Sequence, residues 1–266
     1  MKKIIKTPKE GICQITIADE RWYLFEKDKG EHEYYPSTTW ICSYYPKGIA
    51  FHKWLASKGW DEAEAIKVAA GDKGSKVHKA IEDLLDGKEV KMNSKYVSPA
   101  TDKEEELSLE EYECLMSFQA WHSEVKPRLM AKELIVSNKE YGYAGTVDFI
   151  CEIEGKIWVI DFKTSQNVWP EHELQVSAYA HALRDAYQHI DKLGILQLGY
   201  RKNKKNYNKK NYKLTEVEDK FDLFLAARQI WANETKDVKP LKRDYPLTLT
   251  LEELSDDAEG TNASRI

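Results

Sequence analysis

Hydrophobic positions in the first hundred residues follow two different periods. Residues 12–17 (ICQITI) and 21–26 (RWYLFE) are short β-rich runs separated by ADE, which predicts a small hairpin. A helix is expected to begin at Ser37 or Thr38, because either hydroxyl can cap it. From residue 50 to residue 85 apolar side chains recur three and four residues apart. We therefore expect an N-terminal region that is mostly helical.

The remainder of the chain has a more regular order of elements. Residues 86–107 lack a period and mix charge with Gly, Ser and Pro, which predicts a long exposed loop. The pattern then predicts a helix over 108–125, strands over 131–137, 143–153 and 156–163, a helix over 170–187, a strand over 194–200 and a helix near 217–235. The order α-β-β-β-α-β predicts an α/β protein.

Two aspartates and a lysine interrupt the apolar stretch GTVDFICEIEGKIWVIDFKTS. Glu154 and Gly155 suit a two-residue hairpin loop, since glycine tolerates the positive φ that such loops require. In that register Asp148 lies directly opposite Asp161, and Lys163 shares a strand face with Asp161. A three-residue loop would shift the register by one and send the aspartates to opposite faces.

These three charges favour a metal and phosphate site. Two facing carboxylates at that depth repel each other unless a cation holds both, and Mg²⁺ is bound through carboxylates, water and substrate phosphate. The structural alternative is an ion pair near a strand end, with Asp148 as a turn residue. Buried ion pairs are poor stabilisers, which favours the functional interpretation. A serine hydrolase using Ser165 and His172 would lack the G-x-S-x-G elbow.

Two helical pairs accompany these strands. His78 and Glu82 are four residues apart on one helix face, and Gly74 permits close backbone approach. Gln175 and Tyr179 have the same spacing on the later helix. They are usable as donors to a phosphate or to the lysine, although polar packing on a helix surface explains them equally well.

Composition narrows the class of protein. The 266 residues are 42% hydrophobic, enough for one substantial core. No run of 18 apolar residues occurs, and MKKIIKTPKEG has no apolar signal region, so we expect a cytoplasmic protein without a membrane span. The four cysteines form no C-x-x-C pair, which argues against a zinc knuckle and predicts buried free thiols.

The net charge of −5 opposes binding to nucleic acid, so local charge matters. Residues 201–213 (RKNKKNYNKKNYK) form a basic run whose positive charges can neutralise phosphates and whose tyrosines can stack on bases. The candidates are Lys204, Lys205, Tyr207, Lys209, Lys210 and Tyr212. A solvated basic loop is the alternative. The acidic and polar stretch at the end of residues 241–266 predicts a disordered tail.

Several motifs resemble one nuclease superfamily. GTVDF, VIDFKTS and ELQVSAYAHAL, in this order within β-β-α, resemble the PD-(D/E)xK nucleases of the RecB exonuclease group, and GSKVHKAIE resembles the upstream G-x-x-x-H element of that group. YYPSTTWICSYYPKGIAFHKWLASKGW is similar to the N-terminal part of the mitochondrial genome maintenance exonuclease and related phage enzymes, which cut single-stranded DNA from ends. The resemblance implies a restriction-endonuclease-like core with a mixed central sheet flanked by helices.

The resemblance also implies roles for individual residues. The implied ligands of Mg²⁺ or Mn²⁺ are Asp148, Asp161, the backbone carbonyl of Phe162 and His78. Lys163 would orient the attacking water, Gln175 would support Lys163 or the nucleic-acid backbone, and Tyr179 would pack beside it on the nucleic-acid side. Some relatives hold an iron–sulfur cluster through cysteines near the C-terminus; no cysteine follows Cys151, so we expect no cluster.

We expect a metal-dependent DNA exonuclease acting on single strands or ends in replication, recombination or repair, with proteins of those processes as further partners. The alternatives are a structure-specific or restriction-type endonuclease of the same fold, and a catalytically silent nucleic-acid-binding module. The expected division is an N-terminal hairpin and helical region over 1–107, a nuclease core over 108–240 and a tail over 241–266. The expected setting is the cytoplasm of a bacterium or a phage-infected host.

Overall fold

The structure is a computed structural model that describes the greater part of the chain. The described residues are 3–6, 12–17, 20–26, 32–184, 187, 189–201 and 211–236. Residues 202–210, which carry most of the predicted basic run, and the predicted tail lie outside this set. No helix within it combines the length and the apolar character needed to cross a membrane.

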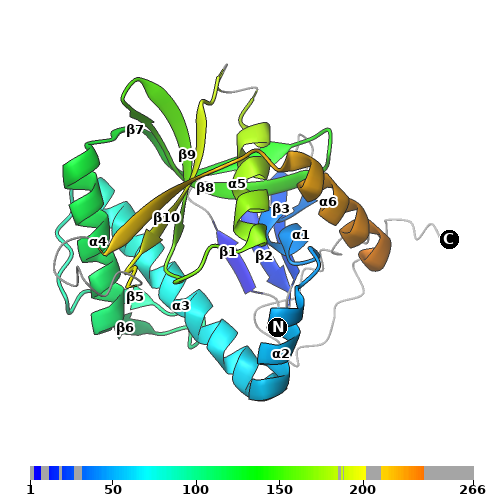
Figure 1. Ribbon diagram of the computed structural model, residues 1–266, viewed down its shortest axis with the longest axis horizontal. Helices are drawn as coiled ribbons and strands as arrows, with labels where there is room; N and C mark the ends of the chain where they lie inside the picture. The colour runs from blue at the N-terminus through cyan, green and yellow to red at the C-terminus, as the bar shows by residue number, and fades with distance from the viewer. Residues whose placement is uncertain are drawn as a thin grey trace, which may run out of the picture.

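A five-stranded mixed sheet forms the centre of the molecule (Figure 1). Its strands, in spatial order, are β11 (Tyr212–Val217), β10 (Lys192–Leu198), β9 (Lys156–Lys163), β8 (Tyr143–Ile153) and β7 (Arg128–Asn138). Strands β9 and β10 are parallel, and the other neighbours are antiparallel. The predicted order α-β-β-β-α-β is confirmed, and β9 is the central strand, as its two apolar faces indicated.

The turn between β8 and β9 has the predicted length. Glu154 and Gly155 have φ of 52° and 75°, so both central residues are left-handed, as a two-residue hairpin loop requires. Ile153 pairs with Lys156 across this turn, and the pairing continues without a shift. The predicted register is therefore confirmed, and it fixes which strand faces carry the charged residues.

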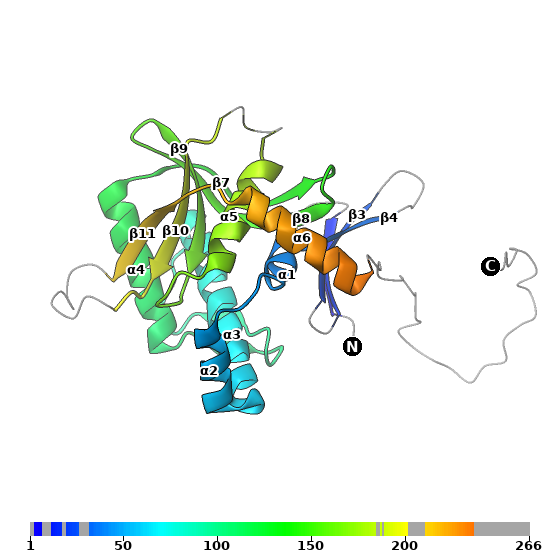
Figure 2. The same ribbon diagram turned by 45° about the vertical axis from the view of Figure 1, so that its right-hand side comes forward.

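Helices cover both faces of this sheet (Figures 1 and 2). On one face α3 (Trp60–Leu85) and α4 (Leu109–Val125) bury Ile81, Phe118 and Trp121 against Phe149 and Phe162. On the other face α5 (Pro170–Ala182) packs Val176 and Tyr179 onto strand residues that include Val147, Ile150 and Val159. The polar residues discussed below lie where these two apolar layers end.

Several helix boundaries differ from the prediction. The continuous helix expected over 50–85 is two helices, α2 (Ile49–Lys58) and α3, because Gly59 adopts a φ of 77°. The α4 boundary is confirmed: Ser108 and Glu111 form a reciprocal capping box. Helix α5 ends at Ala182 rather than near residue 187. Helix α6 (Phe221–Thr235) starts four residues later than predicted.

The N-terminal region contains more strand than predicted. The expected hairpin is present as β2 (Ile12–Ile17) and β3 (Glu20–Glu26), but β1 (Lys3–Lys6) and β4 (His32–Pro36) extend it to four antiparallel strands. Ser37 caps the short helix α1 (Thr38–Cys42) through its hydroxyl and bridges to Ala144 of β8. This contact places α1 against the central sheet.

Three further strands lie where loops were predicted. Residues 86–107 contain the hairpin β5 (Lys95–Val97) and β6 (Glu104–Glu106), which docks through the buried Tyr96. Strand β11 begins at Tyr212, inside the run predicted to be a basic segment. The free, buried thiols are confirmed for Cys42, Cys114 and Cys151. The division into domains stays a prediction.

Candidate active site

Asp148 lies where β8 and β9 separate. Their ladder ends at the pair of Phe149 and Ile160, so the next residues in this register are Asp148 and Asp161. The Asp148 carboxylate instead accepts a hydrogen bond from the Phe162 backbone N–H at 2.7 Å. A side chain thus replaces a backbone partner at this point and holds the carboxylate beside the strand.

His78 connects helix α3 to both strands. Its Nδ1 lies 3.4 Å from Asp148 Oδ1, and its Nε2 donates to the Phe162 carbonyl at 3.1 Å. Burial lowers the pKa of His78, but the charge and hydrogen bond of Asp148 outweigh burial and raise it to about 9. The same pairing lowers the pKa of Asp148 despite its burial. Three of the predicted ligand groups therefore meet in this structure.

Glu133 on β7 is a site residue that the sequence reasoning missed. Its carboxylate, the Asp148 carboxylate and a His78 ring nitrogen all lie within 4.8 Å of one another. Glu133 has a φ of 43°, left-handed backbone inside a strand, and it interrupts the pairing of β7 with β8 opposite Asp148. Burial and then the charge of Asp148 raise the pKa of Glu133 to about 8. A glutamate within the apolar run AKELIVS was the available signal.

Asp161 and Lys163 form the second half of the cluster. The Lys163 ammonium lies 2.6 Å from Asp161 Oδ2, yet neither Asp161 oxygen has a partner with hydrogen-bond geometry among the described residues. Asp161 is 1% exposed. Burial raises its pKa to about 6, with Lys163 opposing that shift. Burial lowers the pKa of Lys163, but the two aspartates reverse this and raise it overall.

Gln175 and Tyr179, the predicted pair on α5, hold the Lys163 ammonium through a chain of hydrogen bonds. The Lys163 ammonium donates to Gln175 Oε1 at 3.2 Å, and Gln175 Nε2 donates to the Tyr179 hydroxyl at 2.6 Å and to Thr39 Oγ1 at 3.3 Å. Tyr179 is only 3% exposed, so in this structure it has almost no surface to offer nucleic acid, against the predicted contact. Its position is that of a packing residue behind Gln175.

The glycine that permits a close approach is Gly145 and not, as predicted, Gly74. A Cβ at Gly74 would meet nothing within 4 Å among the described atoms. A Cβ at Gly145, the first residue of GTVDF, would lie 2.4 Å from the Tyr179 ring. Gly145 therefore gives Tyr179 the room that the Gln175 contact requires.

Glu82 does not join the cluster either. Its carboxylate pairs with Lys79 at 2.5 Å.

Chemically, the cluster fits a hard divalent cation. Three carboxylates, those of Asp148, Asp161 and Glu133, face two cationic side chains, and the raised pKa values of Asp161 and Glu133 show that their negative charge is poorly compensated. Asp161 Oδ1 has no partner among the described residues and is an acceptor available to a ligand, whereas Oδ2 contacts the Lys163 ammonium. Carboxylate oxygens, a carbonyl oxygen and an imidazole nitrogen suit Mg²⁺ or Mn²⁺. Asp161 is not part of the group of His78, Glu133 and Asp148 whose ligand atoms lie within 4.8 Å of one another, so the four side chains do not form one ligand group in this structure.

The predicted nucleic-acid residues are only partly described. Lys204, Lys205, Tyr207, Lys209 and Lys210 lie outside the described residues. Tyr212 is the first residue of β11, and its hydroxyl donates to Glu124 at 2.7 Å while its ring packs against the core. Tyr212 is thus engaged within the fold in this structure.

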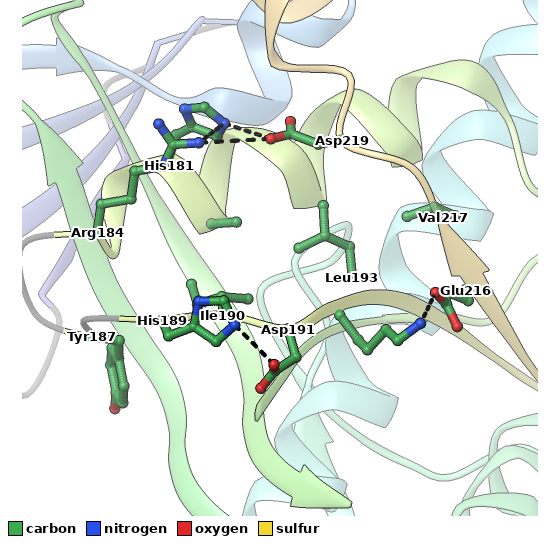
Figure 3. Close-up of a pocket in the computed structure, with 12 residues that line it drawn as sticks. His181, Arg184, Tyr187, His189, Ile190, Asp191, Leu193, Glu216, Val217 and Asp219 are labelled. Atoms are coloured by element: carbon green, nitrogen blue, oxygen red, sulfur yellow. Dashed lines mark hydrogen bonds and ion pairs between the residues drawn. The ribbon is translucent and has the colours of Figure 1, made fainter. Parts of the chain in front are cut away.

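A cavity of about 440 Å³ lies away from this cluster, at the opposite end of β9 and β10 (Figure 3). Its charged side chains pair with one another: His181 lies 2.7 Å from Asp219, and His189 lies 2.9 Å from Asp191. Because these side chains are already paired with one another, the cavity does not compete with the acidic cluster as the candidate active site.

A mixed sheet whose central strand ends in an acid-x-lysine motif, beside a second acid on the preceding strand, defines the restriction-endonuclease-like fold. The sequence model of the PD-(D/E)XK nuclease superfamily matches residues 43–244, and the chain belongs to that superfamily. The predicted superfamily and fold are therefore confirmed.

Solved structures and curated protein sequences give two further comparisons. A crystal structure described as "Putative exonuclease" from Eubacterium rectale matches with a TM-score of 0.42 and 14% identity, covering 71% of this chain and 79% of that one. A search of curated protein sequences gives no match.

Proposed function

We propose that this nuclease is a metal-dependent DNA exonuclease of the RecB-like group, acting on single-stranded DNA or on DNA ends. Superfamily membership makes the chain a nuclease. The observation that supports metal dependence is the buried Asp161, whose Oδ1 has no partner among the described residues while its Oδ2 contacts only the Lys163 ammonium, beside ligand atoms of Asp148, His78 and Glu133 that lie within 4.8 Å of one another. Buried carboxylates left in this condition are costly to the fold, so their presence favours a bound cation.

The ligands that we assign to this cation are His78, Asp148, Asp161, the Phe162 carbonyl and, in addition to the sequence-based set, Glu133. Mg²⁺ or Mn²⁺ held there would polarise the scissile phosphate and lower the pKa of an attacking water. We assign no iron–sulfur cluster, because no cysteine follows Cys151.

The chain's own groups position the reactants. Lys163 carries an ammonium beside the two aspartates, from which it donates a hydrogen bond to Gln175 and would orient the attacking water and offset phosphate charge. Gln175 restricts where that ammonium can point, because its Oε1 accepts one of the ammonium protons. Gln175 is in turn fixed by Thr39 and Tyr179, from α1 and α5. We assign Tyr179 this positioning role rather than a direct contact with DNA.

The preference for single strands or ends rests on the sequence resemblance of the N-terminal segment and of GSKVHKAIE to end-directed enzymes. The same resemblance supports a role in replication, recombination or repair, in a bacterial or phage-infected cytoplasm. The basic run 201–213 remains a proposed contact with the DNA backbone.

A panel of DNA substrates tests the proposal. Linear single-stranded, linear duplex and closed circular DNA are incubated with the protein and Mg²⁺, Mn²⁺ or a chelator. We expect metal-dependent loss of linear single strands and intact circles. Cutting of circles would show an endonuclease instead, and binding without metal-dependent cutting would overturn both enzyme proposals.

A further inference from the structure

One segment beside the site has an unusual composition for an acidic protein. Residues 38–59, which include α1 and α2, contain three lysines and no aspartate or glutamate, although the whole chain has a net charge of −5. Helix α2 has no buried residue, and α2 and α3 run side by side away from the sheet (Figure 2). A positively charged surface with exposed apolar side chains is a signature of nucleic-acid contact.

Lys47, just before α2, ties this segment to the active site. Its ammonium pairs with Glu171 in the first turn of α5. On the next residue, burial and then the charges of Lys163 and Lys47 lower the pKa of His172 to about 3. Glu171 lies one helical turn before Gln175, which accepts a hydrogen bond from the Lys163 ammonium, so the Lys47–Glu171 ion pair lies one turn of α5 from the residue that holds Lys163.

Exposed aromatic side chains occur in both segments that the Lys47–Glu171 ion pair joins. The Phe51 ring lies beneath the Lys47 ammonium at 5.7 Å, is 39% exposed, and has the Trp54 ring at 5.8 Å. Trp169 is 51% exposed and stands two residues before Glu171, at the end of the segment that leads from Lys163 into α5. Phe51 is four residues from Lys47 and Trp169 is two residues from Glu171, so the Lys47–Glu171 ion pair joins the two segments that carry these exposed rings.

We propose that Trp169 and Phe51 stack on bases of a single strand as it enters the nuclease site, while Lys47 exchanges Glu171 for a backbone phosphate. This inference rests on the proposed function and adds the feature that selects unpaired DNA. In a duplex the base faces are covered by their neighbours, whereas a single strand exposes faces to any aromatic ring regardless of sequence. Charge complementarity supports this occupant, since the segment offers cations and no carboxylate of its own.

A second apolar surface provides the contrast. Trp60 is 72% exposed and lines a groove of about 620 Å³ between α3 and the β5–β6 hairpin, together with Asp61, Glu64 and Glu105. Those carboxylates repel phosphate, so exposure of an aromatic ring alone does not predict DNA binding there. Trp60 is therefore a matched control for Trp169.

The test measures binding apart from cleavage. Fluorescein-labelled oligothymidine and a duplex of equal length are titrated with the full chain in chelator, by fluorescence anisotropy. We expect Trp169→Ala and Phe51→Ala each to weaken single-strand binding about tenfold, with little effect on the duplex. Trp169→Phe keeps an aromatic ring and should retain most of the affinity, and Trp60→Ala should change nothing. Glu171→Gln frees Lys47 and should tighten binding.

A photocrosslink makes the test independent of the variants. An oligonucleotide carrying 5-iodouracil should form adducts on peptides that contain Trp169 or Phe51. Adducts confined to other peptides, or unchanged single-strand affinity in both alanine variants, would overturn the stacking proposal. Cleavage assayed in parallel separates the two ideas: DNA cutting without dependence on Trp169 refutes stacking alone, and Trp169-dependent binding without any cutting refutes the nuclease alone.

Discussion

Gly145 offers a direct probe of how the fold supports the site. A Cβ at this position would lie 2.4 Å from Tyr179 Cε1 and 2.9 Å from Thr38 Oγ1, both shorter than real carbon contacts. Neither neighbour is free to yield. The Tyr179 hydroxyl accepts from Gln175 at 2.6 Å, and the Thr38 hydroxyl donates to the Ala144 carbonyl at 3.0 Å. Gly145→Ala must therefore displace the tyrosine ring or α1.

Overpacking of this kind costs about 1–3 kcal/mol of unfolding free energy. A loss of about 2 kcal/mol corresponds to a fall of roughly 4–8 °C in Tm for a protein of this size. Because Tyr179 carries Gln175, and Gln175 accepts the Lys163 ammonium, the rate of DNA cleavage should fall with it. Thermal unfolding and a cleavage assay on the same preparation measure both effects.

The matched control is Gly71→Ala, in the exposed middle of α3. A Cβ there meets nothing within 4 Å among the described atoms, so alanine should raise stability slightly through its higher helix propensity. A Gly145→Ala protein with unchanged Tm and full activity would refute the reasoning that this glycine makes room for Tyr179.

Three further changes test separate parts of the structure. Glu133→Gln should weaken Mn²⁺ binding about tenfold in calorimetric titration, since it removes a carboxylate from the cluster with Asp148; unchanged affinity would remove Glu133 from the ligand set. The pKa of His172 is about 3 in the folded protein and 6.5 in the unfolded chain. Between these two pH values only the unfolded chain takes up a proton, so the unfolding free energy decreases as the pH falls below 6.5. When the pH is lowered from 7 to 5, the unfolding free energy of the wild type should therefore decrease by about 1–2 kcal/mol more than that of His172→Gln, as measured by denaturant titration. An equal decrease in both proteins would contradict this. Lys76→Met leaves Asp72 and the buried Glu111 without their cation and should lower unfolding free energy by about 3–5 kcal/mol, whereas an unchanged denaturation midpoint would show that this network contributes nothing.

The sequence predicted the strand register at the candidate site because local rules determine it. A two-residue turn with Gly155 leaves one register, and in that register Asp148 and Asp161 are the residues that follow the last pair of the β8–β9 ladder. The helical spacing of Gln175 and Tyr179 likewise made them neighbours before any packing was known. Short-range geometry was sufficient for these residues.

The residues that were missed depend on long-range or irregular geometry. Glu133 reaches the cluster because its backbone takes a left-handed conformation within β7, and no periodic pattern predicts such a residue. Trp169 and Phe51 are separated by more than a hundred residues and are related through the Lys47–Glu171 ion pair. The close contact at Gly145 is made by the ring of Tyr179, which is far away in the sequence, whereas Gly74 has no such neighbour among the described atoms.

The most direct measurement compares metal-dependent cleavage of linear single-stranded DNA by the wild type and by Asp161→Asn, a change that keeps the side chain's shape. We predict cleavage by the wild type with Mg²⁺ or Mn²⁺, none with chelator, and a loss on the order of a thousandfold in the variant, equivalent to about 4 kcal/mol of transition-state stabilisation. Circular dichroism should show the same fold in both proteins. Undiminished cleavage by Asp161→Asn would contradict the assignment of this acid and lysine cluster as the nuclease site.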